Sequence, residues 1–272
     1  MVNFAPGQPK LAGTMAARVN LSEVISALSC ALDLTEGQPI GHTMRSCLIG
    51  MRLGRESGLS ASDSAALYYA LLLKDAGCSS NAARLCQLFG SDDLELKPRM
   101  RAVDRQSKLA LAIQTARTVA MDGGFSDKIM RFVDVARADG VMKEIIGLRC
   151  ERGADIAMRL GFPQPTAEAV KHLDEHWNGR GHPDGLSGPA IPLMSRIANL
   201  AQVVDVFHQH DGSRGAISIA RRRSGTWFDP ALVDRVVAWR NETSWWERLD
   251  STDPTDEVIA AEPMRSEERR VG

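Results

Sequence analysis

The chain has 272 residues, of which 44% are hydrophobic, 5% aromatic and 25% charged, and its formal net charge is −1. These proportions allow a normal buried core, and the low aromatic content fits helices that pack through aliphatic side chains. With almost no net charge, the chain has no overall field that attracts nucleic acid or an anionic membrane, so contact with either would have to be local.

The cysteines and the hydropathy pattern indicate a protein with reduced thiols, without a membrane span or a secretion signal. No Cys-x-x-Cys pair occurs, and an odd number of cysteines is typical of reduced thiols in a cytoplasmic protein rather than of a disulfide framework or a structural zinc site. No apolar run approaches the roughly 18 residues of a membrane span. Residues 1–20 lack the apolar stretch of a secretion signal. The five cysteines are Cys30, Cys47, Cys78, Cys86 and Cys150.

In the first half of the chain, the sequence predicts helices after a short N-terminal segment. Residues 1–19 are rich in glycine, proline and alanine and are expected to be disordered. The first helix is predicted to end near residue 32, with Ser22 as its N-cap residue. Apolar residues at helical spacing predict a second helix from residue 40, which Gly58 ends. A third helix is predicted from Ser60 or Ala61 to about Lys74.

The remainder of the chain also predicts helices, and no alternating strand pattern is convincing. A loop over residues 178–190 interrupts them. The expected fold is therefore all-α, with a helical domain over residues 20–250. The further predicted helices cover residues 79–89, 101–121, 126–138, 140–160, 164–176, 191–209, 213–223, 229–239 and 243–249.

The C-terminal residues differ in composition from the helical part. Residues 251–264 are acidic and rich in proline and threonine, which predicts a linker. Residues 265–272 read Arg-Ser-Glu-Glu-Arg-Arg-Val-Gly, the translation of a common sequencing-library adaptor in one frame. We expect this segment to be a non-native tail; the alternative is an ordinary charged tail.

A loop punctuated by glycine and proline carries the strongest motif. Residues 175–186 read Glu-His-Trp-Asn-Gly-Arg-Gly-His-Pro-Asp-Gly-Leu, and Ile-Pro-Leu and Arg-Ile follow at residues 191–193 and 196–197. This pattern resembles the loop H-H-E-x-x-D-G-x-G-Y-P-x-G-L, then I-P-L and R-I, of HD-GYP proteins. These are metal-dependent phosphohydrolases that open cyclic di-GMP. The resemblance covers about residues 21–240 and implies an HD-type helical bundle.

In that family, histidines and aspartates on several helices hold one to three divalent metals, which generate hydroxide and neutralise the phosphodiester. The resemblance places His42 at the first ligand position. The segment Leu71–Gly77 resembles the family's L-L-H-D-I-G, with Lys74 in place of the histidine and Asp75 retained. Arg149 falls at the next ligand histidine, by its spacing from a glycine.

The loop and the helix after it depart further from the family pattern. The two histidines before the glutamate fall on Leu173 and Asp174, and the loop aspartate falls on Asn178. The last ligand aspartate falls on Gln202, whereas Asp205 matches a second aspartate that is not a ligand. The candidate metal ligands that remain are His42, Asp75 and Asp174.

Two of the replacements are cations, which cannot bind a metal ion and repel one. We therefore expect no resident cofactor, and iron or manganese if a divalent metal binds. We further expect Lys74 and Arg149 to pair with Asp75 and Asp174 in place of the metal charge, which demands good geometry in a buried pair. The alternative is that both cations extend to solvent.

Two functions from different classes follow from the resemblance. In the first, the chain is a degenerate HD-GYP-like module that regulates, senses a ligand or dimerises within a larger bacterial signalling protein. In the second, it is a weak metal-dependent phosphohydrolase of the cyclic di-GMP phosphodiesterase type, with His172 or His176 as further candidate ligands. A third possibility is that the site binds a nucleotide without hydrolysing it, because arginine can contact phosphate oxygens in pairs. The candidate binding residues are Lys74, Arg149, Asn178 and Arg196.

Residues 201–208 and 224–234 resemble a narrower group of bacterial, often actinobacterial, proteins. These have two HD-type halves, of which the first is typically degenerate, and they often end in a LuxR-type helix-turn-helix. The resemblance implies a C-terminal HD-GYP half or helix-turn-helix as partner, a cyclic dinucleotide as candidate ligand and a homodimer as candidate assembly. Neither membrane contact nor direct nucleic-acid binding is expected, because the basic run at residues 221–223 fits a helix C-terminus.

Overall fold

The computed structural model describes residues 20–78, 143, 146–250 and 253–263. Within these residues the chain is all-α, as predicted, and β-structure is limited to isolated bridges that join Asn178 to Ser187 and Ser224 to Phe228. The expected disorder of residues 1–19, the tail at 265–272 and three predicted helices lie outside the described residues. Those three helices were expected at 79–89, 101–121 and 126–138.

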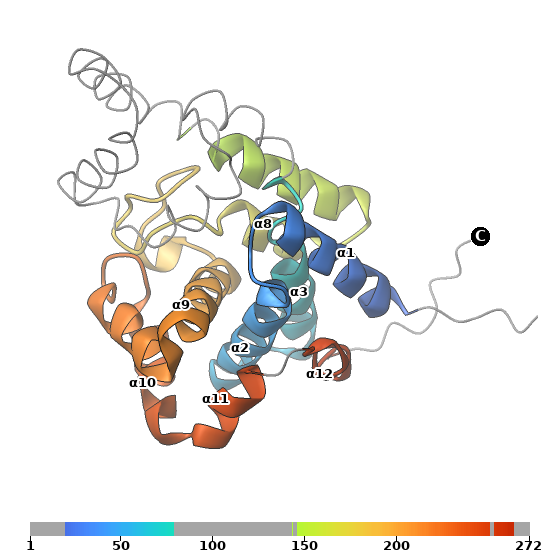
Figure 1. The fold of residues 1–272 in the computed structure, drawn as a ribbon. Helices are drawn as coiled ribbons and strands as arrows, with labels where there is room; N and C mark the ends of the chain where they lie inside the picture. The colour runs from blue at the N-terminus through green and yellow to red at the C-terminus, as the bar shows by residue number, and fades with distance from the viewer. Residues whose placement is uncertain (1–19, 79–142, 144–145, 251–252, 264–272) are drawn as a thin grey trace, which may run out of the picture.

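Three helices form the centre of the bundle. Helix α2 (His42–Glu56) packs against both α3 (Ala61–Leu73) and α9 (Leu193–Arg222) (Figure 1). Helix α1 (Leu21–Thr35) lies against α2 and α3, and α8 (Gln164–Lys171) lies against α3 and α9. Because α3 is enclosed on so many sides, all eight of its residues from Ala66 to Leu73 are buried.

Short elements surround this centre. A helix over residues 146–159 precedes α8. The short turn η2 (Gly188–Ala190) belongs to the glycine-rich loop. Helix α10 (Pro230–Ala238) packs on α9 and α2, and η3 (Trp239–Asn241) and α11 (Thr243–Leu249) continue from it. None of the helices in the described part of the chain combines the length and apolar character needed to cross a membrane.

Two glycines let α2 and α3 approach closely. A Cβ atom on Gly50 would lie 2.6 Å from Leu71 Cδ1, and one on Gly54 would lie 2.7 Å from Leu67 Cδ2. Larger residues at these positions would force the two helices apart and lose contacts between tightly packed side chains. The Gly-x-x-x-Gly spacing in α2 therefore serves helix packing in the core.

Several helix boundaries differ from those expected. Helix α1 is capped by Asn20 and Glu23 in a capping box rather than by Ser22, which is buried. Ser60 caps α3 as predicted, accepting a hydrogen bond from the backbone N–H of Asp63 at 3.1 Å. The helices expected at 191–209 and 213–223 form one kinked helix, α9, because Gly212 with φ 67° turns the chain without ending the helix.

The segment expected to be a linker contains a packed helix, α12 (Thr255–Ala260). It lies against α1 and α2 (Figure 1), and Val258 is fully buried. Tyr68 donates its hydroxyl proton to the Val258 carbonyl at 3.1 Å, and Tyr69 donates to Glu262 at 2.5 Å. The linker prediction is therefore wrong for this stretch: burial of one apolar side chain and two tyrosine contacts hold it on the bundle.

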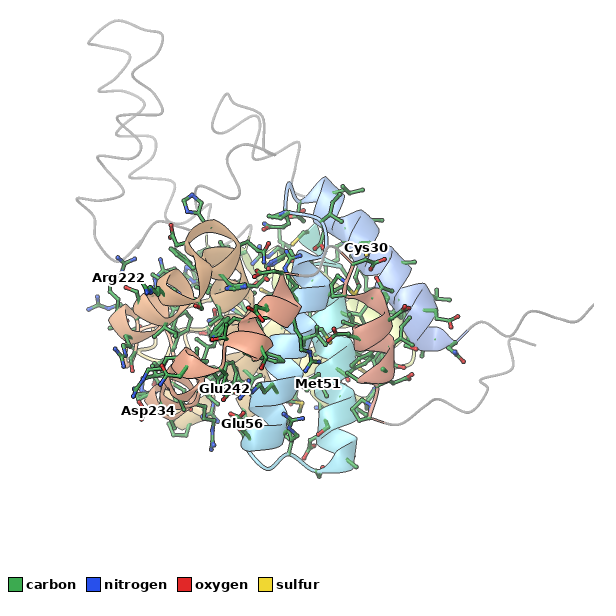
Figure 2. The ribbon with its side chains drawn as sticks, turned by 60° about the horizontal axis from the view of Figure 1, so that its bottom comes forward. Cys30, Met51, Glu56, Arg222, Asp234 and Glu242 are labelled. Atoms are coloured by element: carbon green, nitrogen blue, oxygen red, sulfur yellow. The ribbon has the colours of Figure 1, made fainter. Side chains whose placement is uncertain are left out.

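An arginine between two tryptophans fastens the end of the bundle. The Arg52 guanidinium lies 4.3 Å from the centre of the Trp239 ring and 4.7 Å from that of Trp245. It also donates to Glu56 at 2.8 Å and to Glu242 at 2.7 Å, and Figure 2 shows these two carboxylates near each other beside α2. Stacking of a cation on aromatic rings adds to the charge contacts, so η3 and α11 are held on α2.

The turn after α3 lies directly on the helix of residues 146–159. A Cβ atom on Gly77 would lie 2.0 Å from the carbonyl oxygen of Arg149 and 2.7 Å from the backbone nitrogen of Gly153. Gly153 itself faces Val170, at 2.8 Å from where its Cβ would lie. This close backbone approach brings the end of α3 beside Arg149, and only glycine permits it.

Substitution of Gly77 tests this contact. We expect Gly77→Ala to lower the free energy of unfolding by about 1–3 kcal/mol, because the new methyl group meets backbone atoms that cannot move aside. Gly147→Ala is the matched control: its Cβ would meet nothing closer than Pro183 at 3.8 Å. The control should be neutral or more stable by up to about 1 kcal/mol. Urea denaturation of both variants measures the difference, and equal stabilities would contradict the packing.

Candidate functional site

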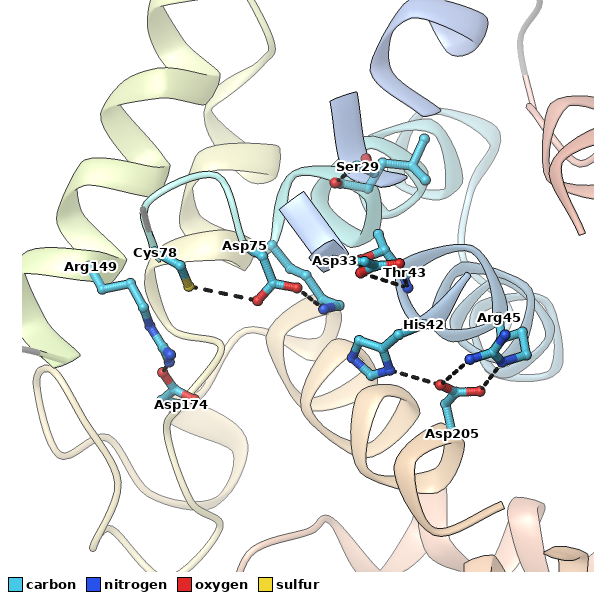
Figure 3. Close-up of polar contacts among 12 residues, drawn as sticks. Ser29, Asp33, His42, Thr43, Arg45, Asp75, Cys78, Arg149, Asp174 and Asp205 are labelled. Atoms are coloured by element: carbon cyan, nitrogen blue, oxygen red, sulfur yellow. Dashed lines mark hydrogen bonds and ion pairs between the residues drawn. The ribbon is translucent and has the colours of Figure 1, made fainter. Parts of the chain in front are cut away.

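A buried carboxylate on α9 joins the two helices at the centre of the candidate site. Asp205 is fully buried; its Oδ2 accepts from His42 Nδ1 at 2.7 Å, and its Oδ1 accepts from Arg45 Nε at 2.7 Å (Figure 3). Arg45 also donates to the Ile40 carbonyl at 2.9 Å. Since His42 and Arg45 belong to α2, this network ties the first turn of α2 to the middle of α9.

A second buried carboxylate holds the start of α2. Asp33 on α1 accepts from the Thr43 hydroxyl at 2.6 Å and from the Thr43 backbone N–H at 3.1 Å. The negative charge lies at the N-terminus of α2, where the helix dipole favours it and where backbone N–H groups lack partners within the helix. The first turn of α2, which carries His42, is thus held from both α1 and α9.

The first predicted ion pair is present. The Lys74 ammonium, just after α3, contacts the Asp75 carboxylate, and both residues are at most 4% exposed. The Cys78 thiol lies 3.8 Å from the other Asp75 oxygen. Lys74 therefore does not extend to solvent. A lysine charge buried against a carboxylate neutralises the group that the family resemblance assigns to a metal.

The second predicted ion pair is also present. Arg149 contacts Asp174 in a partly buried pair, and the Cys150 thiol lies 3.6 Å from the same carboxylate. Burial by itself lowers the pKa of Arg149, but the charge of Asp174 and the nearby Cys78, Cys150 and Asp75 raise that pKa above its usual value. Arg149 is therefore a fixed cation. Burial first, and then Asp174, raise the pKa of Cys150, which keeps it a thiol.

The three candidate metal ligands do not come together as a metal site. His42 is bonded to Asp205, Asp75 to Lys74 and Asp174 to Arg149 (Figure 3). Among the residues that the structure describes, no group of three or more histidine, cysteine, aspartate or glutamate side chains is arranged to hold a metal ion. The described donor set does not fit the metal centre that the family resemblance implies. That the protein holds no resident cofactor stays a prediction.

The glycine-rich loop is held by a buried glutamate. Glu175 accepts the backbone N–H groups of Asp184 at 2.7 Å and of Gly185 at 2.9 Å. Burial raises the pKa of Glu175 even though these N–H groups favour its charged form. Asp184 in turn contacts Lys171 at 2.9 Å and His172 at 3.1 Å. His172 thus anchors the loop and belongs to no metal cluster among the described residues.

The other two candidate binding residues have structural contacts. The Asn178 side-chain oxygen accepts from the Arg180 backbone N–H at 3.1 Å within the loop. Arg196 on α9 donates to Asp229 at 2.6 Å, and Asp229 caps α10 by accepting from the Ala231 N–H at 2.9 Å. Neither contact joins these residues to Lys74 or Arg149. A shared phosphate site of Lys74, Arg149, Asn178 and Arg196 therefore stays a prediction, in which a ligand would have to compete with carboxylates.

Sequence reasoning missed two members of the central network. Arg45 was assigned no role, and Asp33 lies just beyond residue 32, where the first helix was expected to end. Asp205 was placed by the resemblance but without a role. A buried carboxylate needs partners, so an aspartate within the apolar run of α9 signals that polar partners exist but does not identify them.

Comparisons with known proteins agree on the family. A family model described as HD domain matches residues 136–232. The chain is 40% identical over 247 residues to the 3'3'-cGAMP-specific phosphodiesterase 3 of Vibrio cholerae, which covers 90% of this chain and 54% of the relative. The crystal structure of a cyclic GMP-AMP specific phosphodiesterase from V. cholerae superposes with a TM-score of 0.68 and 36% identity, over 88% of this chain and 53% of that one.

The chain belongs to the HD-type phosphohydrolase superfamily. The cyclic di-GMP phosphodiesterase response regulator RpfG of Xanthomonas campestris is a further relative, 35% identical over 78 residues that cover 26% of this chain and 20% of that protein. The chain spans about half the length of these V. cholerae matches. The HD-type helical bundle expected from the sequence is thus confirmed, whereas the narrower group of two-HD proteins stays a prediction.

The central network predicts a strong dependence of stability on Asp205. We expect Asp205→Ala to lower the free energy of unfolding by about 3–5 kcal/mol, because it leaves the buried Arg45 charge without its carboxylate. Asp211→Ala, which removes an exposed carboxylate 2.9 Å from His210, is the control and should change stability by less than about 0.5 kcal/mol. Chemical denaturation measures both. A loss for Asp205→Ala no larger than the control's would contradict the role of the network.

The ion pairs predict that the fold does not depend on a divalent metal. We expect dialysis against a chelator to shift the melting temperature by less than about 1 °C, because Lys74 and Arg149 already balance Asp75 and Asp174, and a ligand that does not bind cannot stabilise. Differential scanning calorimetry before and after chelation measures the shift. A clear drop that manganese or iron reverses would show a bound metal and contradict this interpretation.

Proposed function

We propose that the protein acts as a cyclic-dinucleotide phosphodiesterase of the HD type, and that this chain supplies one HD-type part of it. The observation that carries the proposal is the 40% identity to a 3'3'-cGAMP-specific phosphodiesterase along 90% of the chain. A structural likeness to a cyclic GMP-AMP specific phosphodiesterase over 88% of the chain supports it. The substrate class is therefore a cyclic dinucleotide with 3',5' phosphodiester bonds, 3'3'-cGAMP first among them.

The metal chemistry of this family bears directly on the proposal. Bound divalent metals would supply a hydroxide nucleophile and neutralise the phosphodiester. The described residues do not fit such a centre, because Lys74 and Arg149 contact the carboxylates that would be its ligands. Hydrolysis by the protein therefore requires metal ligands other than His42, Asp75 and Asp174 as they stand here. The two ion pairs are proposed to stabilise the bundle.

A second function is favoured by those same ion pairs. In it, this chain is a non-catalytic module that regulates, senses a ligand or dimerises within a signalling protein. Two basic side chains at the expected ligand positions, each paired with a carboxylate, support it. The comparisons favour the phosphodiesterase function of the two, because the relatives that match along most of the chain are phosphodiesterases. The two functions are compatible if the chain is a supporting part of a working enzyme.

A chimaera tests the proposed function. This chain would replace the matching 54% of the V. cholerae 3'3'-cGAMP-specific phosphodiesterase 3, and the product of 3'3'-cGAMP hydrolysis would be measured by liquid chromatography. We expect linear dinucleotide to form, because the chain shares the fold and 40% of its residues with the part it replaces. The parent enzyme is the positive control. A folded chimaera without turnover would contradict the proposal.

The role of the ion pair can be tested in the same chimaera. We expect the double change Lys74→Met with Asp75→Asn to keep turnover within about threefold, because the pair is replaced by uncharged side chains of similar volume and no metal is lost. Loss of turnover in the folded double variant would place the chemistry at the Lys74–Asp75 pair.

Calorimetry with 3'3'-cGAMP on the unmodified chain distinguishes the second function, for which binding without hydrolysis is the expected result.

A further inference from the structure

A groove lies beyond the kink of α9, apart from the residues of the candidate site. Gly212, with φ 67° and ψ −171°, redirects the helix, and the part that follows it lies beside η3. Side chains of both elements line a hollow of about 400 Å³. That volume falls within the range of small-ligand sites, which is roughly 300–1,000 Å³.

Three arginines converge on this groove from two sides. Arg214 and Arg221 lie on α9, two helical turns apart and therefore on one face, with Ser218 between them. Arg240 faces them from η3, together with the amide of Asn241. Two opposing walls of guanidinium, hydroxyl and amide donors distinguish this groove from a row of solvated arginines along one helix.

The positive charge of the groove is not neutralised within the described residues. No hydrogen bond or ion pair joins any of its three guanidinium groups to a carboxylate there. The acidic residues next to them in sequence have other partners: Asp211 contacts His210 at 2.9 Å, and Glu242 contacts Arg52 at 2.7 Å. Asp234 on α10 is exposed (Figure 2).

The lining also limits what the groove can recognise. Its apolar wall is the aliphatic Ile217, and no aromatic ring lines it. Base stacking, which dominates the binding of single-stranded nucleic acid, therefore has no platform here. Arginine forks match phosphate oxygens in pairs, so this lining suits phosphate groups better than nucleobases.

We propose that this groove binds a small ligand with two phosphate groups, such as inorganic pyrophosphate or the diphosphate of a nucleotide. Arg214 and Arg221 hold one side of the diphosphate and Arg240 the other, and Ser213, Ser218 and Asn241 supply neutral donors. Affinity then follows the number of phosphates and not the identity of the base. Because the arginines are exposed, affinity also falls steeply as salt screens the charges.

Isothermal titration calorimetry of the full chain with inorganic pyrophosphate tests the proposal. We expect binding at low salt, with Arg214→Gln, Arg221→Gln and Arg240→Gln each weakening it by about tenfold, as loss of a charged hydrogen bond does. Arg222→Gln is the matched control: this arginine is exposed on the same helix (Figure 2) but does not line the groove. The affinity of Arg222→Gln for pyrophosphate should stay within about twofold of that of the unmodified chain.

Titrations with other ligands identify the ligand class. AMP, ADP and GDP should separate by phosphate number, with ADP and GDP equal and AMP weaker. Absence of heat at about 5 mM pyrophosphate would overturn the proposal. So would an equal loss in Arg222→Gln, which would mean diffuse surface charge, or much tighter binding of a single-stranded oligonucleotide, which would mean a nucleic-acid surface. The arginines are exposed, so the variants are expected to fold, and circular dichroism checks this.

Discussion

The buried carboxylate of Asp205 is the interaction on which the rest of the bundle depends. It receives hydrogen bonds from His42 and Arg45 and so fixes the start of α2 against α9, the two central helices with the most extensive contact. A charge without water around it is costly unless it is paired. Because Asp33 holds the same turn of α2 from α1, three helices meet at one point whose geometry is set by charge rather than by apolar packing alone.

The same logic explains the two ion pairs near this network. In the HD family a metal would balance the carboxylates, whereas here Lys74 and Arg149 do so with charges of the chain itself. The contact of Gly77 with the backbone of Arg149 brings the two pairs to the same place. The HD-type fold is therefore kept while Asp75 and Asp174 are paired with cations of the chain, and membership of the family does not by itself define what this site does.

Motifs with local spacing could be predicted, whereas contacts between distant residues could not. The all-α fold, the cap at Ser60 and both ion pairs followed from helical periodicity and from the substituted ligand positions. The Asp205 network could not, because its members are more than 150 residues apart and their burial depends on the complete bundle. Helix α12 was missed because its composition reads as a linker, and only Val258 and two tyrosine contacts make it a packed element.

The most direct test of this account is the metal content of the purified chain after expression with added iron and manganese. Mass spectrometry of the metals should find far less than one equivalent, because Asp75 and Asp174 are held by cations of the protein. An equally low metal content in His42→Ala and Asp75→Ala would agree with a chain that holds no metal at these residues. One or more equivalents in the original chain, lost in both variants, would show that these residues are metal ligands and contradict the account.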